Sequence, residues 1–291
     1  MGAPPRVALD ATPRAVASTP DGSGGFVAAG TRVIAVDLAT RQGNVSGQLD
    51  LKRTITGLTV SPDGKRLLAS RRGAIDIVDV DVATLARTGS ISLNGAQPGA
   101  LDISPDGRRA AVALGRRIAF VDLVGERLLR RKTVGAIGGV SFAPSGRLVW
   151  VSTTNGILRG LDRISASERS RIRLGRGVGT GLAIAPDGRR AAVAANRGGS
   201  SVAIADLRRQ RLQTRVRTGK GVGTPVYSED GSRLYVADGG ASTISIVSTR
   251  SNKRIAAYWL GAGLRPRGLA LRAPPAGEGS ADQDSSTGPR P

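Results

Sequence analysis

The amino-acid sequence predicts an all-β protein, a β-propeller built from four-stranded antiparallel blades. A Pro-Asp-Gly turn, or a close variant of it, recurs with its glycine at positions 22, 64, 107, 146, 188 and 231. These glycines are 42, 43, 39, 42 and 43 residues apart, and a period of about 40–45 residues is typical of propeller blades. Short apolar runs follow one another in the same order in every unit, and no long stretch shows helical periodicity.

Each unit is predicted to hold four strands, taken here in chain order. The first is an apolar alternating run before the turn, as at residues 58–61 and 101–104. In the turn, proline fixes φ and glycine accepts a positive φ, and a second strand follows, as at residues 148–151. The third strand ends near an aspartate, as at residues 118–122, and the fourth is polar and rich in arginine, as at residues 211–216. Four short strands with turns between them form one blade.

The chain holds six complete units and part of a seventh. A further innermost strand is expected at residues 266–271, and residues 6–9 fit an outermost strand that would complete the last blade from the other end of the chain. We therefore expect one propeller domain over residues 1–272 and a disordered tail over residues 273–291, which are rich in Pro, Gly, Ser and Asp. Repeats of helix pairs are disfavoured because Gly and Pro interrupt every window long enough for a helix.

The composition excludes several classes of site. The chain has no cysteine, which excludes disulfides and thiolate chemistry, and no histidine, which excludes a Ser-His-Asp triad and histidine-bound zinc or haem. We expect no cofactor and no tightly bound zinc, copper or iron. No apolar run is long enough to cross a bilayer, so no membrane span is expected. Residues 1–10 show no secretory signal.

The repeated aspartates and glycines of the turns are predicted to be structural. An aspartate in such a turn bonds to the backbone two residues further on. Regular repetition also argues against catalysis, because a catalytic residue needs to occur only once. The residues assigned to structural turns are Asp21, Gly22, Asp63, Gly64, Asp106, Gly107, Asp187, Gly188, Asp230 and Gly231.

Polar residues that do not repeat from unit to unit are better candidates for ligand binding. In a propeller, the loops from fourth to first strand and from second to third strand gather on one face around the central channel. On this alignment the channel mouth at that face receives Arg71, Arg72, Asn155, Asn196, Arg197 and Asp238. Glycine-rich stretches at residues 176–180 and 220–224 also lie there; they lack the Walker spacing and a following helix, so tight turns are favoured over phosphate cradles.

The formal charge of the chain is +21, from 43 basic against 22 acidic residues. Arginines follow the turns and recur on the outer strands of the middle units, which predicts binding of polyanions at low salt. Aromatic residues make up only 3% of the chain and mostly fall at predicted core positions, so platforms for stacking bases are not evident. A solvated basic rim that binds polyanions without specificity is therefore favoured over a nucleic-acid interface.

Two stretches resemble the repeat of a known family. Residues 228–238, SEDGSRLYVAD, and residues 185–196, APDGRRAAVAAN, are similar to the unit of YVTN or YncE-type propellers, relatives of the WD-repeat fold. The resemblance covers about residues 12–272 and implies a propeller. It also implies an extracytoplasmic bacterial protein, periplasmic or secreted, while the residues themselves leave the compartment open. The six complete units depart from the seven blades that are common in this family.

Three functions remain open at this point. The favoured one is a non-catalytic, monomeric scaffold that binds a protein, a peptide or a small ligand at the channel mouth. The second is a hydrolase similar to the propeller lactonases, whose gluconolactonase-type members hold a divalent ion with carboxylate and amide oxygens. Only Asp238, Asn155 and Asn196 would supply such oxygens, and the nearby arginines would repel a cation, so an enzyme is the less favoured hypothesis. The third is an electrostatic binder of nucleic acid or another polyanion.

Overall fold

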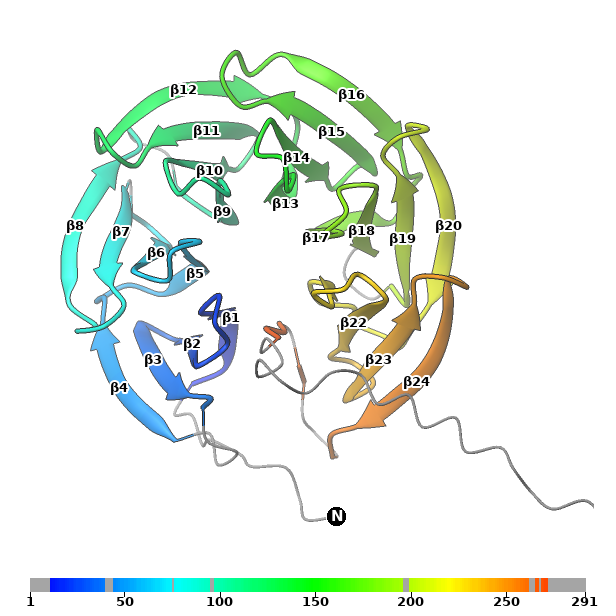
Figure 1. The fold of residues 1–291 in the computed structure, drawn as a ribbon, viewed down its shortest axis with the longest axis horizontal. Helices are drawn as coiled ribbons and strands as arrows, with labels where there is room; N and C mark the ends of the chain where they lie inside the picture. The colour runs from blue at the N-terminus through cyan, green and yellow to red at the C-terminus, as the bar shows by residue number, and fades with distance from the viewer. Residues whose placement is uncertain are drawn as a thin grey trace, which may run out of the picture.

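A computed structural model describes residues 11–39, 44–74, 76–94, 97–195, 199–261, 265–266 and 268–271 of the chain. These residues form six four-stranded antiparallel sheets and no helix, and the sheets stand as blades around a central channel (Figure 1). The predicted all-β propeller of four-stranded blades is therefore confirmed.

The blades are numbered in chain order, and each holds four consecutive strands from the axis outward. Blades 1 and 2 consist of β1 (Pro13–Ser18), β2 (Gly24–Ala29), β3 (Arg32–Asp37) and β4 (Val45–Asp50), then β5 (Ile55–Val60), β6 (Arg66–Arg71), β7 (Asp76–Asp81) and β8 (Arg87–Ser92). Blades 3 and 4 consist of β9 (Leu101–Ile103), β10 (Arg109–Leu114), β11 (Arg117–Asp122) and β12 (Arg127–Thr133), then β13 (Ile137–Phe142), β14 (Leu148–Thr153), β15 (Ile157–Asp162) and β16 (Glu168–Arg173). Blades 5 and 6 consist of β17 (Val178–Ile184), β18 (Arg190–Ala195), β19 (Ser201–Asp206) and β20 (Arg211–Arg217), then β21 (Val226–Tyr227), β22 (Arg233–Asp238), β23 (Thr243–Ser248) and β24 (Lys253–Trp259).

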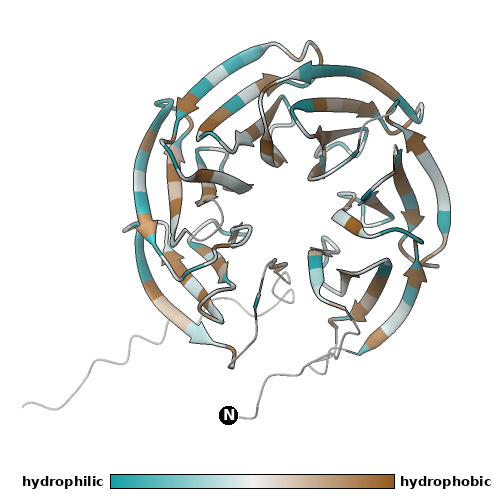
Figure 2. Cartoon of the chain, turned by 180° about the vertical axis from the view of Figure 1, so that it is seen from behind, coloured by the Kyte–Doolittle hydropathy of each residue, from teal (hydrophilic) through white to brown (hydrophobic). Residues whose placement is uncertain are grey.

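The two middle strands of each blade are almost continuously apolar, because both of their faces pack against neighbouring blades. Five of the six residues of β10 are buried, three of them alanines, and Phe120 on the adjacent β11 is completely buried. Small side chains suit these strands because the blades converge toward the axis. The outermost strands are more exposed to solvent. In β20, exposed polar side chains, three of them arginines, alternate with half-buried or buried ones, and Figure 2 shows hydrophilic bands along the outer ring.

A β-bulge occurs between the third and fourth strands of every blade. In blade 3 the register shifts between Phe120 and Val121 opposite β12, and the other five blades show the shift at the equivalent place. A bulge increases the right-handed twist of a strand pair. The outermost strands consequently swing round to follow the circumference of the ring (Figure 1).

The turns between first and second strands have nearly the same geometry in all six blades. Their glycines have φ between 67° and 72°, the left-handed region that favours glycine. In blade 3, Ser104 Oγ donates to Asp106 Oδ1 at 2.6 Å, and the Arg108 N–H donates to the same oxygen at 3.1 Å. Equivalent bonds hold Asp63 and Asp230. These carboxylates are therefore engaged by their own turns.

The ring of blades has a break between blade 6 and blade 1. Successive blades pack through their innermost strands, β1 on β5, β5 on β9, β9 on β13, β13 on β17 and β17 on β21. Within the described residues no strand of blade 6 packs on a strand of blade 1 to this extent. Figure 1 shows the break between β24 and β4.

Residues 268–271 lie beside the channel at the break, along β1. Ser18 Oγ donates to Leu271 O at 3.1 Å, and Gly268 approaches Val16 closely. This segment forms no strand in the part of the chain that the structure describes. The predicted partial seventh repeat is therefore not confirmed, and the outermost strand and the tail expected at residues 6–9 and 273–291 lie outside the described residues.

Candidate functional site

The residues predicted to form a channel mouth lie on three different blades. Arg71 and Arg72 are at the end of β6, Asn155 follows β14, and Asp238 ends β22. Among the described residues no hydrogen bond or ion pair joins these four side chains to one another. Asn196 and Arg197, the remaining members of the predicted set, lie outside the described residues.

Two of these residues have partners inside the fold. Arg71 is buried; its Nη1 donates to Leu51 O at 2.9 Å and its Nη2 to Asp76 Oδ1 at 2.8 Å, so it ties blade 1 to blade 2. Asp238 is completely buried and accepts a hydrogen bond from Ser245 Oγ at 2.6 Å.

The other two are open to solvent. Arg72 and Asn155 are exposed, and Asn155 Oδ1 accepts a hydrogen bond from Thr153 Oγ1 at 2.6 Å. Both side chains are therefore accessible to a ligand at this face.

A large hollow lies at the end of the channel opposite the predicted mouth. It has a volume of about 1120 Å³ and is lined by innermost strands and by residues 269–271. It opens among the Pro-Asp-Gly turns, at Thr19, Pro20 and Ser228, which follow the ends of the innermost strands. The wide half of the channel thus faces away from the mouth predicted from the sequence.

The channel narrows toward that predicted mouth because glycine backbones close it. The narrow part has a volume of about 200 Å³, and its lining includes Gly57, Gly138, Gly139 and Gly181. A Cβ atom at Gly138 would overlap the backbone at Gly179, so only glycine permits this close packing of blade 4 on blade 5.

The wide half of the channel is acidic. Its charged lining residues are Asp102, Glu229 and Asp230, and no lysine or arginine lines it among the described residues. The full chain has 43 basic and 22 acidic residues. A lining whose charged side chains are all carboxylates therefore has the opposite sign of charge to the chain as a whole. Negative charge inside a confined hollow attracts cations more strongly than negative charge in open solvent does.

Asp102 lies in the middle of β9 and is only partly exposed. Its Oδ1 accepts the Ile103 N–H at 2.9 Å, and its Oδ2 accepts the Phe142 N–H of the next blade at 2.7 Å. Burial raises the pKa of Asp102 to about 6, against the opposing effect of these hydrogen bonds. No cationic side chain pairs with this carboxylate among the described residues. The ionised group therefore lacks a counter-charge.

Sequence reasoning did not single out Asp102, although a signal was present. Three residues before the proline position of the turn, the other five units carry Ala17, Thr59, Ser141, Ala183 and Val226. Asp102 is the one acid at this position and so meets the criterion of a non-repeated polar residue.

Asp230, at the rim of the hollow, accepts hydrogen bonds from residues of its own turn. Hydrogen bonds from Ser228 and Ser232 lower its pKa to about 2. The carboxylate is therefore ionised at any physiological pH, and it contributes negative charge to the opening. Glu229 beside it is exposed.

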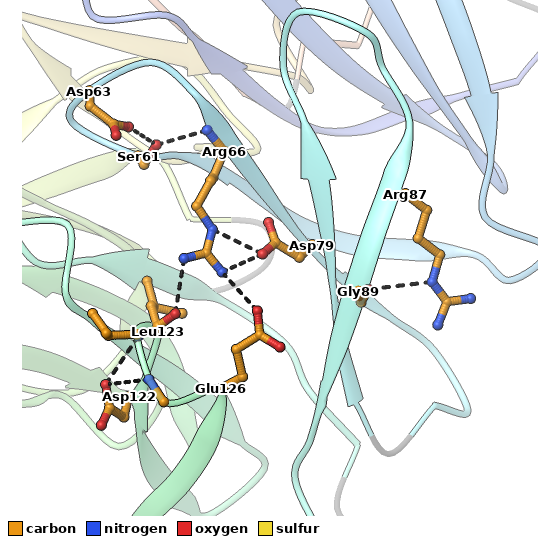
Figure 3. Close-up of polar contacts among 11 residues, drawn as sticks. Ser61, Asp63, Arg66, Asp79, Arg87, Gly89, Asp122, Leu123 and Glu126 are labelled. Atoms are coloured by element: carbon orange, nitrogen blue, oxygen red, sulfur yellow. Dashed lines mark hydrogen bonds and ion pairs between the residues drawn. The ribbon is translucent and has the colours of Figure 1, made fainter.

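The arginines that follow the turns are not merely solvated. Figure 3 shows Arg66 of blade 2 reaching toward blade 3: its Nε donates to Asp79 Oδ2 at 2.9 Å and its Nη1 to Leu123 O at 3.0 Å. Arg190, at the equivalent position of blade 5, donates to Thr249 O of blade 6. These two arginines fasten adjacent blades together.

Arginines, Arg190 among them, also line two hollows on the outer surface. One hollow of about 560 Å³ is lined by Arg117, Arg130 and Arg131, and another of about 390 Å³ by Arg189, Arg190, Arg208 and Arg209. Within the latter, Arg209 pairs with Asp206 at 3.4 Å. These arginines therefore lie on the outside of the ring, away from the acidic half of the channel, although Arg14 lines the narrow part of the channel.

The described residues contain no cluster of three or more acidic side chains placed to hold a metal ion. No helix long and apolar enough to cross a membrane is found in them.

No protein-family model and no curated protein matches the chain. A solved structure of the hydrazine synthase of Kuenenia stuttgartiensis is similar, with a TM-score of 0.78 and 19% sequence identity over 92% of each chain. At this identity the likeness shows the fold alone. The β-propeller is thus supported, and the YVTN or YncE-type family is not confirmed.

Proposed function

We propose that this chain is a non-catalytic propeller that binds a ligand in the wide half of its channel, through the face that carries the Pro-Asp-Gly turns. The proposed ligand carries a positive charge on an apolar stem, as an alkylamine or the lysine or arginine side chain of a peptide does. One observation carries the proposal: the described lining has three carboxylates and no basic side chain in a protein of net charge +21.

The apolar part of the lining supports the proposed stem. Leu58, Val60, Leu101 and Val140 line the hollow from three neighbouring innermost strands, and Tyr235 of β22 also lines it. Binding sites for small molecules combine such apolar walls with a few polar groups that fix orientation. An alkyl stem would cover these side chains while its charged end reaches Asp102.

Asp102 supports the proposed charge. Burial raises the pKa of this carboxylate because the ionised form has lost solvation. A cation that enters beside the ionised form stabilises it, since the cation offsets that loss. Each of the carboxylate oxygens accepts one backbone N–H, and the Ser141 hydroxyl also bonds to the carboxylate. A carboxylate has about four acceptor positions, so one is left for a ligand. The predicted mouth on the opposite face, with Arg72 and Asn155 exposed, stays a proposal for a second point of contact.

Titration calorimetry at physiological salt tests the proposal. Agmatine and 1,5-diaminopentane should bind, whereas pentanoate, with a similar stem and the opposite charge, should not. Replacing Asp102→Asn should weaken the binding of both amines by at least about tenfold, because a charge-assisted hydrogen bond is lost.

Asp50→Asn is the matched control. Asp50 is exposed at the end of β4, distant from the channel, and bonds to Lys52. This variant should bind the amines as the unmodified protein does. Equal weakening by both variants, or equal binding of amine and carboxylate, would refute the channel site.

A second candidate function rests on the two arginine-lined hollows of the outer surface. With Arg130, Arg131, Arg208 and Arg209 exposed there, we propose that polyanions bind without sequence specificity at low salt. Binding of this kind weakens steeply as salt is added. It occupies a different surface from the channel, so one molecule accommodates both.

A further inference from the structure

The innermost strands of the six blades carry two charged side chains in the part of the chain that the structure describes, and these have opposite signs. The strands are β1, β5, β9, β13, β17 and β21, and their charged residues are Arg14 on β1 and Asp102 on β9. Asp102 lines the wide half of the channel, and Arg14 lines its narrow part. The strands around the channel therefore supply one negative and one positive charge.

Arg14 departs from the repeat, as Asp102 does. Six residues before the proline position of the turn, the other five units carry Thr56, Gly99, Gly138, Thr180 and Gly223. Arg14 is the one charged residue and the one long side chain at this position. Since the other five blades form without a charge there, the common architecture of the blades does not require one. A role in binding therefore explains Arg14 better than a role in the fold.

The guanidinium group of Arg14 is available to a ligand. The residue is exposed, and no carboxylate pairs with it among the described residues. An arginine stays charged at every physiological pH and presents its N–H donors in a planar fork. That fork matches the two oxygens of a carboxylate. The narrow part of the channel is thus suited to an anionic group, and the wide half to a cationic one.

The two charges lie at different depths in adjoining hollows. Asp102 is three residues before the proline position of its unit and Arg14 is six residues before it, a difference of about 10 Å along extended strands. Six apolar side chains line both hollows: Val16, Leu58, Leu101, Val140, Leu182 and Leu269. The first five are each four residues before the proline position of their units. They form an apolar ring between the depths of the two charges.

We propose that the channel takes a zwitterion, an ω-amino acid whose ammonium group pairs with Asp102 and whose carboxylate pairs with Arg14. Its alkyl stem crosses the apolar ring between them, and it enters through the wide half. This inference rests on the proposed function and adds to that ligand a second end of opposite charge. A ligand that satisfies both groups makes two charge-assisted interactions, whereas a simple alkylamine makes one.

Ligands with one stem and different ends test the inference. In titration calorimetry at pH 7 and physiological salt, 5-aminopentanoate should bind roughly tenfold or more tightly than pentylamine, which lacks the carboxylate. It should also bind more tightly than 1,5-diaminopentane, whose second ammonium replaces the carboxylate and would meet Arg14 as a like charge. Asp102→Asn should weaken the binding of all three, because each places an ammonium group there.

Three variants of arginine residues assign the preference to Arg14. Arg14→Gln keeps a polar side chain without the charge and should remove the difference in affinity between 5-aminopentanoate and pentylamine. Arg14→Lys keeps the charge without the planar fork and should retain part of that difference. Arg87→Gln is the matched control, because Arg87 is also exposed but lies on β8 at the outside of the ring, and it should preserve the full difference.

The outcomes separate this inference from the proposed function. Equal affinities for 5-aminopentanoate and pentylamine, both weakened by Asp102→Asn, would overturn the zwitterion site and leave the cation site at Asp102 standing. A preference for 5-aminopentanoate that survives in Arg14→Gln, or that falls equally in Arg87→Gln, would overturn the assignment to Arg14. If none of the three amines binds, the proposed function and this inference both fail.

Discussion

The turn glycines and Asp102 show what a single residue reveals in a repeated sequence. The glycines could be predicted because their role recurs in every unit, and the structure gives them φ between 67° and 72°. Asp102 could have been noticed as a non-repeated acid. Its raised pKa could not be predicted, because it depends on burial between β9 and β13, which only the assembled ring creates.

The strain at a turn glycine can be measured apart from crowding. A Cβ atom at Gly107 would meet nothing within 4 Å, and the φ of this residue is 69°. Gly107→Val should therefore destabilise the protein by about 1 kcal/mol or more through backbone strain alone. Gly89, on β8, also has open space around it but no positive φ, so Gly89→Val is the control and should not lower the melting temperature.

At the scale of elements, the four strands of each unit and their order followed from the repeat, whereas the links between blades did not. The sequence shows arginine after most turns, and a solvated rim was the natural interpretation. The structure instead directs Arg66 and Arg190 to carbonyl groups of the following blade. Such a contact depends on how closely one blade stands to the next, which periodicity does not specify.

The link made by Arg66 should contribute measurably to stability. Asp79, its carboxylate partner, has a side chain only 7% exposed, so Arg66→Leu leaves a buried charge without its counter-ion. We expect a loss of roughly 3 kcal/mol in the free energy of unfolding, measured with urea. The double replacement of Arg66 and Asp79 by leucine should lose less.

Arg87, drawn beside this site in Figure 3, provides the control. It is exposed and makes one long hydrogen bond of 3.4 Å to Gly89 O, so Arg87→Leu should have little effect. If Arg66→Leu were as mild as Arg87→Leu, the arginines after the turns would be a solvated rim after all.

At the scale of the whole molecule, the charge and the ring are both asymmetric. Basic residues cover the outside, while the wide half of the channel presents carboxylates among the described residues. The sequence did not reveal which end of the channel is wide, because this depends on glycine packing that only contacts such as Gly138 on Gly179 show. The break between blades 6 and 1 likewise emerges only from the packing of blades.

The pH dependence of amine binding tests the central claim most directly. Burial raises the pKa of Asp102 to about 6, so this carboxylate is mostly protonated at pH 5 and mostly ionised at pH 7, while an alkylamine stays charged throughout. The affinity for agmatine, measured by calorimetry, should therefore rise roughly tenfold from pH 5 to pH 7, and this rise should vanish in Asp102→Asn. An affinity that does not change with pH, or that changes equally in Asp102→Asn, would contradict a cation site at Asp102 in the channel.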